Sequence, residues 1–393
     1  MLKILFLCPY LPHIGVHAGA GRMFNLIVRL SQKYKISVLS YLEGEEERQY
    51  IPELEKYCQK VRVISRQGDF SLSNFSPKFP FYQFFSEQMQ KELLDMLEEN
   101  NFDILQIEYL QMAHYIYFTA TFPVVLTIHE LISKRLFDFF KYEKSLFKKL
   151  KILFKYFLHL NFEINICKRF DAVITLTERE RRNLKSFCPK TNTFVAPMGV
   201  DIFYFKPKSI REESNSLLYV GYFGHYPNVD AVLYFYKDIL PLVKREIPNI
   251  KLYIVGAFPT SEIFTLANGN IFVTGRVDDL RPYYDMACVF IAPIRLGGGM
   301  RGKILEAWAM QKPVVSTPLA TAGIEAIDGK NIFIANTKKD FAKKIIMLLR
   351  NEGLRKKIGF EGRKTVEEKF DWDKIAYNLD GIYQKLVDGN AKE

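Results

Sequence analysis

The sequence has few cysteines, and their spacing builds neither a metal site nor a disulfide framework. The five cysteines of this 393-residue chain lie at Cys8, Cys58, Cys167, Cys188 and Cys288, with no CxxC pair and no Cys/His cluster. This scatter excludes the usual zinc modules, and it fits a protein that is kept in a reducing cytoplasm.

A membrane-spanning segment and a secretory leader are also missing. No stretch has the length and apolar purity of a spanning helix. The first residues, MLKILFLCPYLPHIG, resemble a signal peptide only superficially, because they carry one basic residue and run into Pro9 and Pro12. A first β-strand over Leu2–Cys8 explains them better. We therefore expect a cytoplasmic protein.

The sequence lacks a dinucleotide-binding fingerprint as well. The segment HAGAGRMFNLIVRL holds Gly19 and Gly21 just before a helix that is expected to begin near Arg22. The spacing is not GxGxxG, and no acidic residue is placed for a ribose, which disfavours a dinucleotide cofactor. The two glycines either let the backbone approach a ligand closely or simply give the loop its turn geometry.

Short apolar segments alternate with longer helical patterns along the chain. Several segments are uninterrupted apolar runs, which are typical of parallel strands covered on both faces. The alternation occurs twice, and the chain is too long for one core, so we predict two doubly wound α/β domains. The polar stretch FKPKSIREESNS separates them. The predicted domains are residues 1–207 and 208–370, with a final helix in 371–393 that is expected to pack across both.

The segment RLGGGMRGKILEAWAMQKPVVST is the most informative part of the sequence. A glycine triplet follows an apolar strand, and a helix with two basic residues in its first turn and a glutamate shortly after then begins. These residues are Gly297, Gly298 and Gly299, then Arg301 and Lys303, then Glu306. Cations are unfavourable at a helix N-terminus unless an anion binds there. The pattern predicts a phosphate or diphosphate site, with Glu306 placed to accept hydrogen bonds from sugar hydroxyls. The alternative is a glycine-rich turn before an ordinary helix.

Two more polar residues follow predicted strands directly. His129 comes after Val124–Ile128, and Glu108 comes after Ile104–Ile107. Ligands of open parallel sheets bind at the carboxyl ends of the strands. There His129 can donate to a sugar hydroxyl and change its charge near neutral pH, although a single histidine is often structural. Glu108 either contacts an acceptor or pairs locally.

The formal net charge of +11 is concentrated in residues 134–155, which hold eight basic side chains against Asp138 and Glu143. Leucines and phenylalanines are interleaved at helical spacing. Such a basic amphipathic helix can lie on an anionic membrane surface. Alternatively, it packs its aromatic face inward and leaves the lysines in solvent. No recognisable nucleic-acid module accompanies the charge, so we expect no nucleic-acid partner.

Taken together, these segments resemble the GT-B glycosyltransferases, specifically glycosyltransferase family 4 and its bacterial polysaccharide-assembly members. The resemblance covers nearly the whole chain and rests on APIRLGGGMRGKILEAWAMQKPVVST, LTIHE, GAGR and VTGRVDDLRPYYDMACVFIAP. It implies an α/β fold of two Rossmann-like domains facing a central cleft. It also implies a retaining, metal-independent transfer of a sugar from a UDP- or GDP-sugar to a glycan, lipid-linked or other hydroxyl acceptor, without a cofactor. The expected process is cell-surface polysaccharide biosynthesis.

The resemblance further implies a role for each matching residue. Glu306 would bind the donor ribose, and His129 would contact the donor sugar. The diphosphate would be held by the backbone of Gly299 and Met300 and by the side chains of Arg301 and Lys303. On the opposite wall Gly19 and Gly21 would admit the diphosphate and the sugar, and the segment that ends at Val277 would line the base pocket.

The sequence departs from the family pattern at two places. Gly298 stands where many members carry a first glutamate that is tied to the donor sugar. Tyr222 and Asn228 stand where many members carry an arginine and a lysine, so Arg295 and Arg301 are the expected replacements for that phosphate charge. The missing carboxylate favours an alternative function, a catalytically idle scaffold that binds a nucleotide or a glycan. The basic cluster and His129 favour an enzyme.

Overall fold

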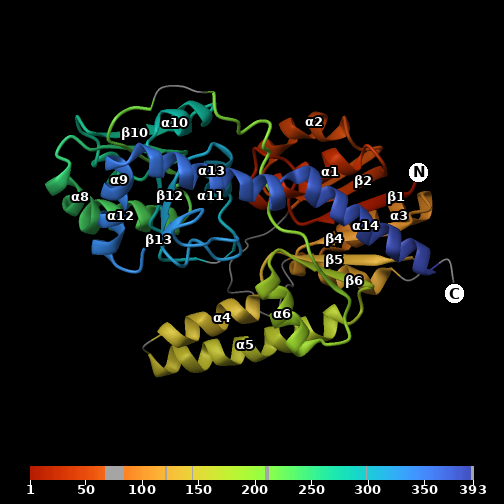
Figure 1. Cartoon of the computed structure of the whole chain (residues 1–393). Helices are drawn as coiled ribbons and strands as arrows, with labels where there is room; N and C mark the ends of the chain where they lie inside the picture. The colour runs from red at the N-terminus through yellow and green to blue at the C-terminus, as the bar shows by residue number, and fades with distance from the viewer. Residues whose placement is uncertain (67–83, 120–121, 144, 209–211, 298, 391–393) are drawn as a thin grey trace. The chain divides into compact units, whose positions relative to one another are not determined.

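The computed structural model describes residues 1–66, 84–119, 122–143, 145–208, 212–297 and 299–390, and these form two α/β units (Figure 1). The first unit comprises Met1–Pro197 together with Trp372–Glu393, and the second comprises Met198–Asp371. The predicted class of two Rossmann-like units is therefore confirmed. The division falls ten residues before the predicted boundary at residue 207, because Val200 pairs with Asp371 and is buried in the second core.

The first unit is built on a parallel sheet with the order β3-β2-β1-β4-β5-β6-β7. Its strands are β1 (Lys3–Cys8), β2 (Lys35–Leu42), β3 (Lys60–Ser65), β4 (Ile104–Glu108), β5 (Val124–Ile128), β6 (Ala172–Thr175) and β7 (Thr193–Val195). The central strands are buried along nearly their whole length, which explains why they form continuous apolar runs in the sequence. The strand order reverses between β1 and β4, which makes this the place where a doubly wound sheet binds ligands.

Helices cover both faces of this sheet. They are α1 (Ala18–Leu30), α2 (Ile51–Glu55), α3 (Glu87–Glu99), α4 (Ile132–Tyr142), α5 (Leu146–Cys167), α6 (Glu178–Phe187) and α14 (Trp372–Asn390), with 3₁₀ segments η1 (Glu45–Tyr50) and η3 (Leu110–Phe118). The last helix, α14, belongs to this unit because it packs on α1, where Asp373 pairs with Arg29 and Asp380 with Lys33.

The second unit has a parallel sheet with the order β10-β9-β8-β11-β12-β13. Its strands are β8 (Ser216–Val220), β9 (Lys251–Val255), β10 (Ile271–Gly275), β11 (Val289–Ala292), β12 (Val314–Ser316) and β13 (Phe333–Ile334). Its helices are α7 (Tyr226–Tyr234), the π-helical turn η4 (Phe235–Ile239), α8 (Leu240–Glu246), α9 (Ser261–Phe264), α10 (Arg281–Met286), α11 (Gly302–Ala309), α12 (Lys338–Arg350) and α13 (Glu352–Lys369). The order reverses between β8 and β11.

Helix α11, which follows the glycine triplet, is held firmly by α13. A Cβ atom on Gly362 would lie 2.5 Å from the ring of Trp308, and one on Gly359 would lie 2.0 Å from the carbonyl oxygen of Gln311. These two glycines therefore let α13 approach closely. Arg363 donates to the carbonyl oxygen of Ala309 at 2.6 Å and so satisfies the C-terminal end of α11.

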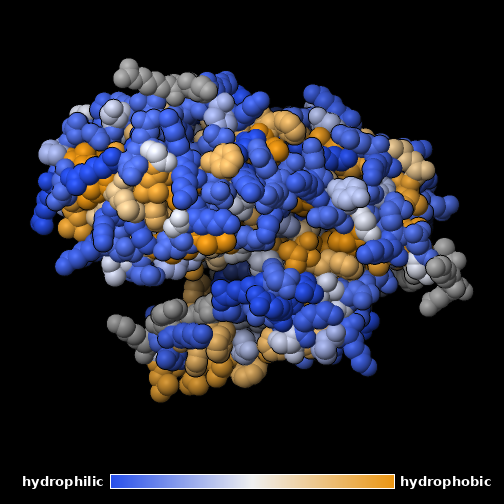
Figure 2. Space-filling view, viewed as in Figure 1, coloured by the Kyte–Doolittle hydropathy of each residue, from blue (hydrophilic) through white to orange (hydrophobic). Residues whose placement is uncertain are grey.

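The single amphipathic helix predicted over residues 134–155 is wrong. The chain forms two helices, α4 and α5, which pack against each other as a hairpin (Figure 1). The backbone is extended at Glu143 and Ser145, and the Glu143 carboxylate accepts from the Ser145 N–H at 2.9 Å, which interrupts the helix. Figure 2 shows apolar side chains gathered along the outer edge of this hairpin.

Candidate active site

In the second unit, the loops after β8 and β11 leave adjacent strands at the same edge of the sheet. Helix α7 begins after the first loop and α11 after the second. Their first turns are in contact, because Lys303 of α11 donates to the side-chain oxygen of Asn228 in α7 at 2.7 Å. A Cβ atom on Gly297 would lie 3.4 Å from Pro227 of α7. Two positive helix ends thus lie side by side at the reversal point of the sheet.

The ammonium group of Lys303 is held by two neighbours, Asn228 and Tyr219. It donates to Asn228 and, at 3.3 Å, to the hydroxyl of Tyr219, whose ring centroid lies 4.6 Å away. Asn228 is itself oriented, since it donates to the carbonyl oxygen of Tyr222 at 2.7 Å and accepts from the Tyr219 hydroxyl at 2.9 Å. A Cβ atom on Gly221 would come within 3.1 Å of the Lys303 nitrogen. Gly221 therefore leaves the space that this nitrogen occupies.

The surroundings of Lys303 disfavour its own charge. Burial of the ammonium and the nearby guanidinium of Arg301 lower the pKa of Lys303 to about 7, and Glu306 opposes the shift. Burial and the same two cations lower the pKa of His225, which precedes α7. The group of residues at this edge therefore holds more positive charge than its surroundings compensate, which favours binding of an anion.

The two arginines expected near the phosphate have different interaction partners. Arg301 precedes α11 and donates to the carbonyl oxygens of Leu296 and Gly297, at 3.3 and 2.9 Å, so it shapes the glycine loop. Arg295 pairs with Asp230 of α7 at 2.7 Å and lies over the ring of Tyr234. The charge of Arg295 is thus balanced within the unit, and Lys303 is the cation that lies against Asn228.

Glu306 lies three residues after Lys303 on α11, and its orientation is set by α10. The buried hydroxyl of Tyr284 donates to one carboxylate oxygen of Glu306 at 2.9 Å. Burial raises the pKa of Glu306, while Tyr284 and Lys303 act in the opposite direction. Tyr284 thus holds one carboxylate oxygen in place, and the other oxygen is the one that the predicted ribose contact would use.

The remaining predicted donor residues lie around this edge. Gly297 and Gly299 have φ of 86° and 78°, a left-handed conformation that favours glycine. Met300 and Val277 are partly buried and pack against the core, Val277 just beyond the carboxyl end of β10. Gly298 lies outside the described residues.

In the first unit, His129 and Glu108 meet at the carboxyl ends of neighbouring strands. The His129 ring nitrogen Nε2 donates to the Glu108 carboxylate at 2.8 Å, and burial lowers the pKa of His129 despite this partner. Glu108 is 1% exposed and also accepts from Gln106 at 3.2 Å and from Arg22 at 3.5 Å. Of the two roles open for Glu108, the structure therefore favours local pairing, in which it orients His129.

The ring of Tyr109 covers one face of His129. The two ring centroids are 3.6 Å apart with an interplanar angle of 10°. Tyr109 has φ of 69°, a strained conformation for a bulky residue that the stacked rings and buried neighbours hold in place. A Cβ atom on Gly19 would lie 1.7 Å from the Tyr109 hydroxyl. Gly19 is therefore required by a neighbouring side chain in this structure.

The prediction that Gly19 and Gly21 lie in a loop before the first helix is wrong. Helix α1 begins at Ala18, so Gly19 and Gly21 lie in its first turn and not ahead of it. No acidic or hydroxyl residue marks this start in the sequence. His17 caps the helix instead, because its Nδ1 accepts from the N–H groups of Gly19 and Ala20 at 3.1 and 3.3 Å. Burial lowers the pKa of His17 to about 4, which keeps the accepting nitrogen free of a proton.

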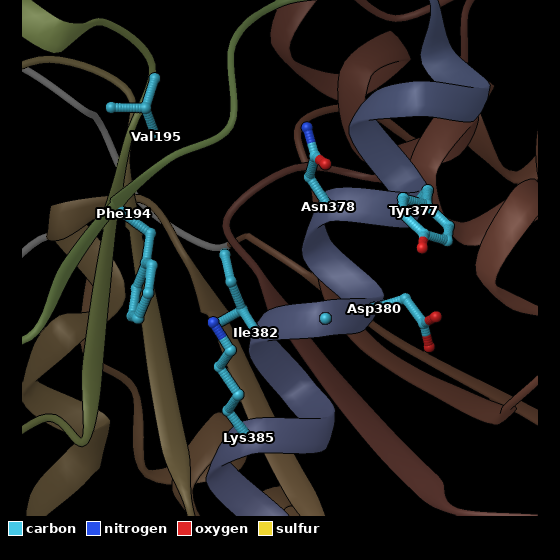
Figure 3. A pocket seen from close by; sticks show the side chains of 8 residues that line it. Phe194, Val195, Tyr377, Asn378, Asp380, Ile382 and Lys385 are labelled. Carbon is cyan, nitrogen blue, oxygen red and sulfur yellow. The ribbon is translucent and has the colours of Figure 1, made fainter.

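A separate hollow of about 400 Å³ opens between β7 and α14 in the first unit (Figure 3). Its lining includes Phe194 and Val195 of β7 and Tyr377, Ile382 and Lys385 of α14. None of the predicted site residues lines it, so it is distinct from both groups of residues described above.

Comparisons with known proteins agree with this arrangement. Residues 22–202 match the family model described as Glycosyltransferase Family 4, and residues 214–351 match the one described as Glycosyl transferases group 1. The two matches together span most of both units. The chain belongs to the family 4 glycosyltransferases.

Two relatives and one solved structure illustrate the relationship. An uncharacterized 44.6 kDa protein in the cps region of Klebsiella pneumoniae is 24% identical over 95% of this chain and 98% of its own. The capsular polysaccharide biosynthesis glycosyltransferase CapM of Staphylococcus aureus is 27% identical over 60% of this chain and 67% of its own. The crystal structure of Anabaena Alr3699/HepE in complex with UDP superposes with a TM-score of 0.67 at 15% identity, covering 98% of this chain and 100% of the other. The similarity to this solved structure shows that the chain has the GT-B fold.

Several residues of the candidate site carry no signal in the sequence. Tyr219 and Tyr284 lie in apolar segments where a tyrosine is typical of a core, and Arg22 lies on a helix where an arginine is typical of the surface. Asn228 stands out in the sequence only as a departure from the family pattern. The sequence does not link Asn228 to Lys303, because the two residues lie 75 positions apart.

We predict that Gly19→Ala displaces the Tyr109 ring from His129 and lowers both turnover and thermal stability, the latter by about 1–3 kcal/mol, as overpacking does. The double variant Gly19→Ala/Tyr109→Phe recovers most of the loss, because the nearest remaining ring atom is 3.1 Å from the new Cβ. Thermal unfolding and steady-state kinetics measure both effects.

The control for this pair is Gly21→Ala. Its Cβ would lie 3.6 Å from Ile14, which is ordinary contact. Because alanine favours a helix over glycine, this variant is expected to be unchanged or up to about 1 kcal/mol more stable. Equal losses in Gly19→Ala and Gly21→Ala would contradict a specific role of the Tyr109 hydroxyl.

We predict a second effect, on the pH dependence of diphosphate binding. Lys303 has a pKa of about 7 in the unbound protein, and an adjacent diphosphate raises it. The favourable contribution is therefore complete below that pKa and is lost as the pH rises through the pKa of the complex. Above about pH 7, affinity for UDP should fall by up to about tenfold per pH unit. Calorimetry in buffers of different ionisation enthalpy should detect proton uptake.

The matched variant is Lys303→Arg, because a guanidinium does not titrate in this range. Its affinity should be nearly independent of pH, with no proton uptake. A wild-type protein that binds UDP equally well on both sides of its Lys303 pKa would refute the assignment.

Proposed function

We propose that this glycosyltransferase moves a sugar from a nucleotide diphosphate sugar to a hydroxyl acceptor, with retention of anomeric configuration and without a metal ion. The observation that carries the proposal is the convergence of Lys303 and two helix N-termini at the reversal point of the second sheet. The diphosphate of the donor is the group whose charge these features match.

Departure of a nucleoside diphosphate increases negative charge on its terminal phosphate. Positive groups at that position stabilise the transition state more than the ground state, and they therefore accelerate departure. In the proposal Lys303, Arg301 and the N-terminal ends of α7 and α11 supply this charge. Glu306, oriented by Tyr284, binds the donor ribose.

His129 contacts the donor sugar in this proposal. It is a neutral imidazole, because burial lowers its pKa, and Glu108 fixes the nitrogen that carries the proton. A neutral ring can form hydrogen bonds with sugar hydroxyls without competing with Lys303 for the diphosphate. Transfer on the face from which the diphosphate leaves accounts for retention.

The substrates are proposed from the relatives. CapM is named for capsular polysaccharide biosynthesis, and HepE was crystallised with UDP. We propose a UDP-sugar as the first donor to test, with a GDP-sugar next, and a glycan or lipid-linked acceptor in cell-surface polysaccharide biosynthesis. With a lipid-linked acceptor, the protein works in the cytoplasm at the inner face of the plasma membrane. Among the described residues no helix is long and apolar enough to span a bilayer.

The alternative, a catalytically idle scaffold that binds a nucleotide, is favoured by one feature, the glycine at position 298 where many members carry a glutamate. Enzyme and scaffold differ in one measurement. An enzyme hydrolyses its nucleotide sugar slowly when no acceptor is present, whereas a scaffold binds it unchanged.

The test is a thermal-shift panel of UDP, GDP, ADP and TDP with their sugar derivatives, followed by a hydrolysis assay. A true ligand at about a hundred times its Kd adds about 2.7 kcal/mol of stability. Lys303→Ala should abolish most of the shift and lower turnover at saturating donor by about tenfold or more, as loss of one charge-stabilising contact does. Lys339→Ala, an exposed lysine on α12, is the matched control.

A shift with one nucleotide but no hydrolysis would favour the scaffold. No shift with any of the compounds would overturn the diphosphate site itself.

A further inference from the structure

The α4–α5 hairpin exposes large apolar side chains that no other part of the described chain covers. On α5 they recur every three or four residues, so they lie on one face of the helix. They are Phe147, Leu150, Phe154 and Phe157, each more than half exposed, with Leu146 beside them at the start of the helix. Phe139 of α4 is also 58% exposed. Figure 2 shows this apolar edge.

Lysines accompany the apolar stripe. Lys148 and Lys151 are exposed on α5, and Lys141 is exposed at the end of α4. Two of them lie over exposed rings, Lys151 at 4.5 Å from the Phe147 ring centroid and Lys141 at 4.7 Å from that of Phe137. Between positions 134 and 155 the sequence holds eight basic and two acidic residues. The net positive charge of this segment is therefore more than half of the formal net charge of +11 that the whole chain carries. An apolar stripe with flanking lysines is typical of helices that lie in a membrane interface.

The base of the hairpin packs into the first unit, whereas the side chains of its outer edge are exposed. The buried carboxylate of Glu163 on α5 accepts from the Ser133 N–H at 3.1 Å and from the Ser133 hydroxyl, in the first turn of α4. Ile166 and Cys167 at the end of α5 belong to the first core. The apolar residues of the outer edge therefore contribute nothing to the core, and folding gives no reason for them.

We propose that the α4–α5 hairpin is a membrane-docking element that inserts its apolar edge, Phe147, Leu150, Phe154 and Phe157 with Phe139, into the interface of a bilayer rich in anionic lipid. The lysines meet the lipid phosphates while the rings enter the boundary between headgroups and acyl chains. The hairpin lies in the interface and does not cross it.

Charge decides between a lipid surface and a second copy of the chain as the occupant. Two hairpins face to face would bring two strongly basic segments together, which is unfavourable. An anionic leaflet supplies the opposite charge, and each lysine near it raises the partition coefficient about fivefold. This inference adds to the proposed function, because docking would bring the site to a lipid-linked acceptor, yet the docking itself requires no donor or acceptor.

The experiment is flotation of the full-length protein with vesicles of equal parts phosphatidylglycerol and phosphatidylcholine, and with vesicles of phosphatidylcholine alone. The wild-type protein should bind the anionic vesicles, and high salt should weaken binding. The triple variant Phe147→Ser/Leu150→Ser/Phe154→Ser should lower partition by about a hundredfold or more. Lys141→Gln/Lys148→Gln/Lys151→Gln should lower it by about a hundredfold, from three lysines.

Matched controls come from the second unit. Phe264→Ser/Phe360→Ser removes two exposed phenylalanines, and Lys339→Gln/Lys343→Gln/Lys357→Gln removes three exposed lysines, so both should bind vesicles like the wild type. The thermal shift with UDP and the melting temperature should be unchanged in every hairpin variant. This separates a failure of docking from a failure of the diphosphate site.

Three results would overturn the proposal. The first is a wild-type protein that binds anionic and neutral vesicles equally well, or that binds neither kind of vesicle. The second is a hairpin triple variant that binds like its control. The third, from light scattering without lipid, is a wild-type dimer that the apolar triple variant converts to a monomer, which would make a second copy the occupant.

Discussion

The candidate site of the second unit depends on one hydrogen bond, the 2.7 Å contact from the Lys303 ammonium to the Asn228 side-chain oxygen. It joins the first turns of α7 and α11, and so it determines that two helix N-termini and a cation act at one position. A lysine at the positive end of a helix is unfavourable without a compensating group. Asn228 and Tyr219 compensate only partly, because an amide and a phenol are neutral. The remaining positive charge is what an anionic ligand can satisfy.

The two units place polar residues at the same point of their sheets, but the charges of these residues are balanced in the first unit and not in the second. In both sheets the strand order reverses beside the first strand of the unit, and polar residues lie after the two strands at the reversal. In the first unit these charges are paired internally, since Glu108 accepts from Arg22 and His129 and all three are buried or nearly so. In the second unit the Lys303 ammonium donates to the neutral side chains of Asn228 and Tyr219, and Glu306 offsets its charge only in part. The polar cluster of the first unit therefore balances its own charge, whereas that of the second unit keeps positive charge that an anion can offset.

Much of the fold follows from the sequence, because buried parallel strands and amphipathic helices are local patterns. The strand over Leu2–Cys8 is predicted to within a residue, and the strand over Val124–Ile128 has the same bounds as β5. The contacts that define the site are not local. Lys303 lies 75 residues from Asn228 and 84 from Tyr219, and periodicity carries no information about such pairs. The break between α4 and α5 escapes prediction for a different reason. Glu143 and Ser145 are both tolerated inside helices, and the sequence does not reveal that the Glu143 carboxylate accepts from the Ser145 N–H where the helix ends.

Glycines illustrate how the same residue type can serve three physical needs. At Gly19 a side chain would collide with the Tyr109 hydroxyl, so the glycine serves a packed ring. At Gly221 it would crowd the Tyr219 ring and the Lys303 nitrogen, at 3.0 and 3.1 Å, so the glycine leaves room for the cation and its partner. At Gly299 no atom of the described residues lies within 4 Å of where a Cβ would stand, yet φ is 78°, so the glycine serves the backbone conformation of a loop.

Of these three cases, only the last matches what a phosphate needs to approach peptide N–H groups, which is a left-handed backbone beside open space at a helix N-terminus. A glycine-rich loop is therefore weak evidence for a ligand when taken by itself, because neighbouring side chains account for Gly19 and Gly221 without any ligand. The evidence becomes stronger where such a glycine precedes a helix whose first turn carries a cation that its neighbours compensate only in part. Gly299 and Lys303 together meet that condition, whereas Gly19 does not, since its neighbour is a packed phenol.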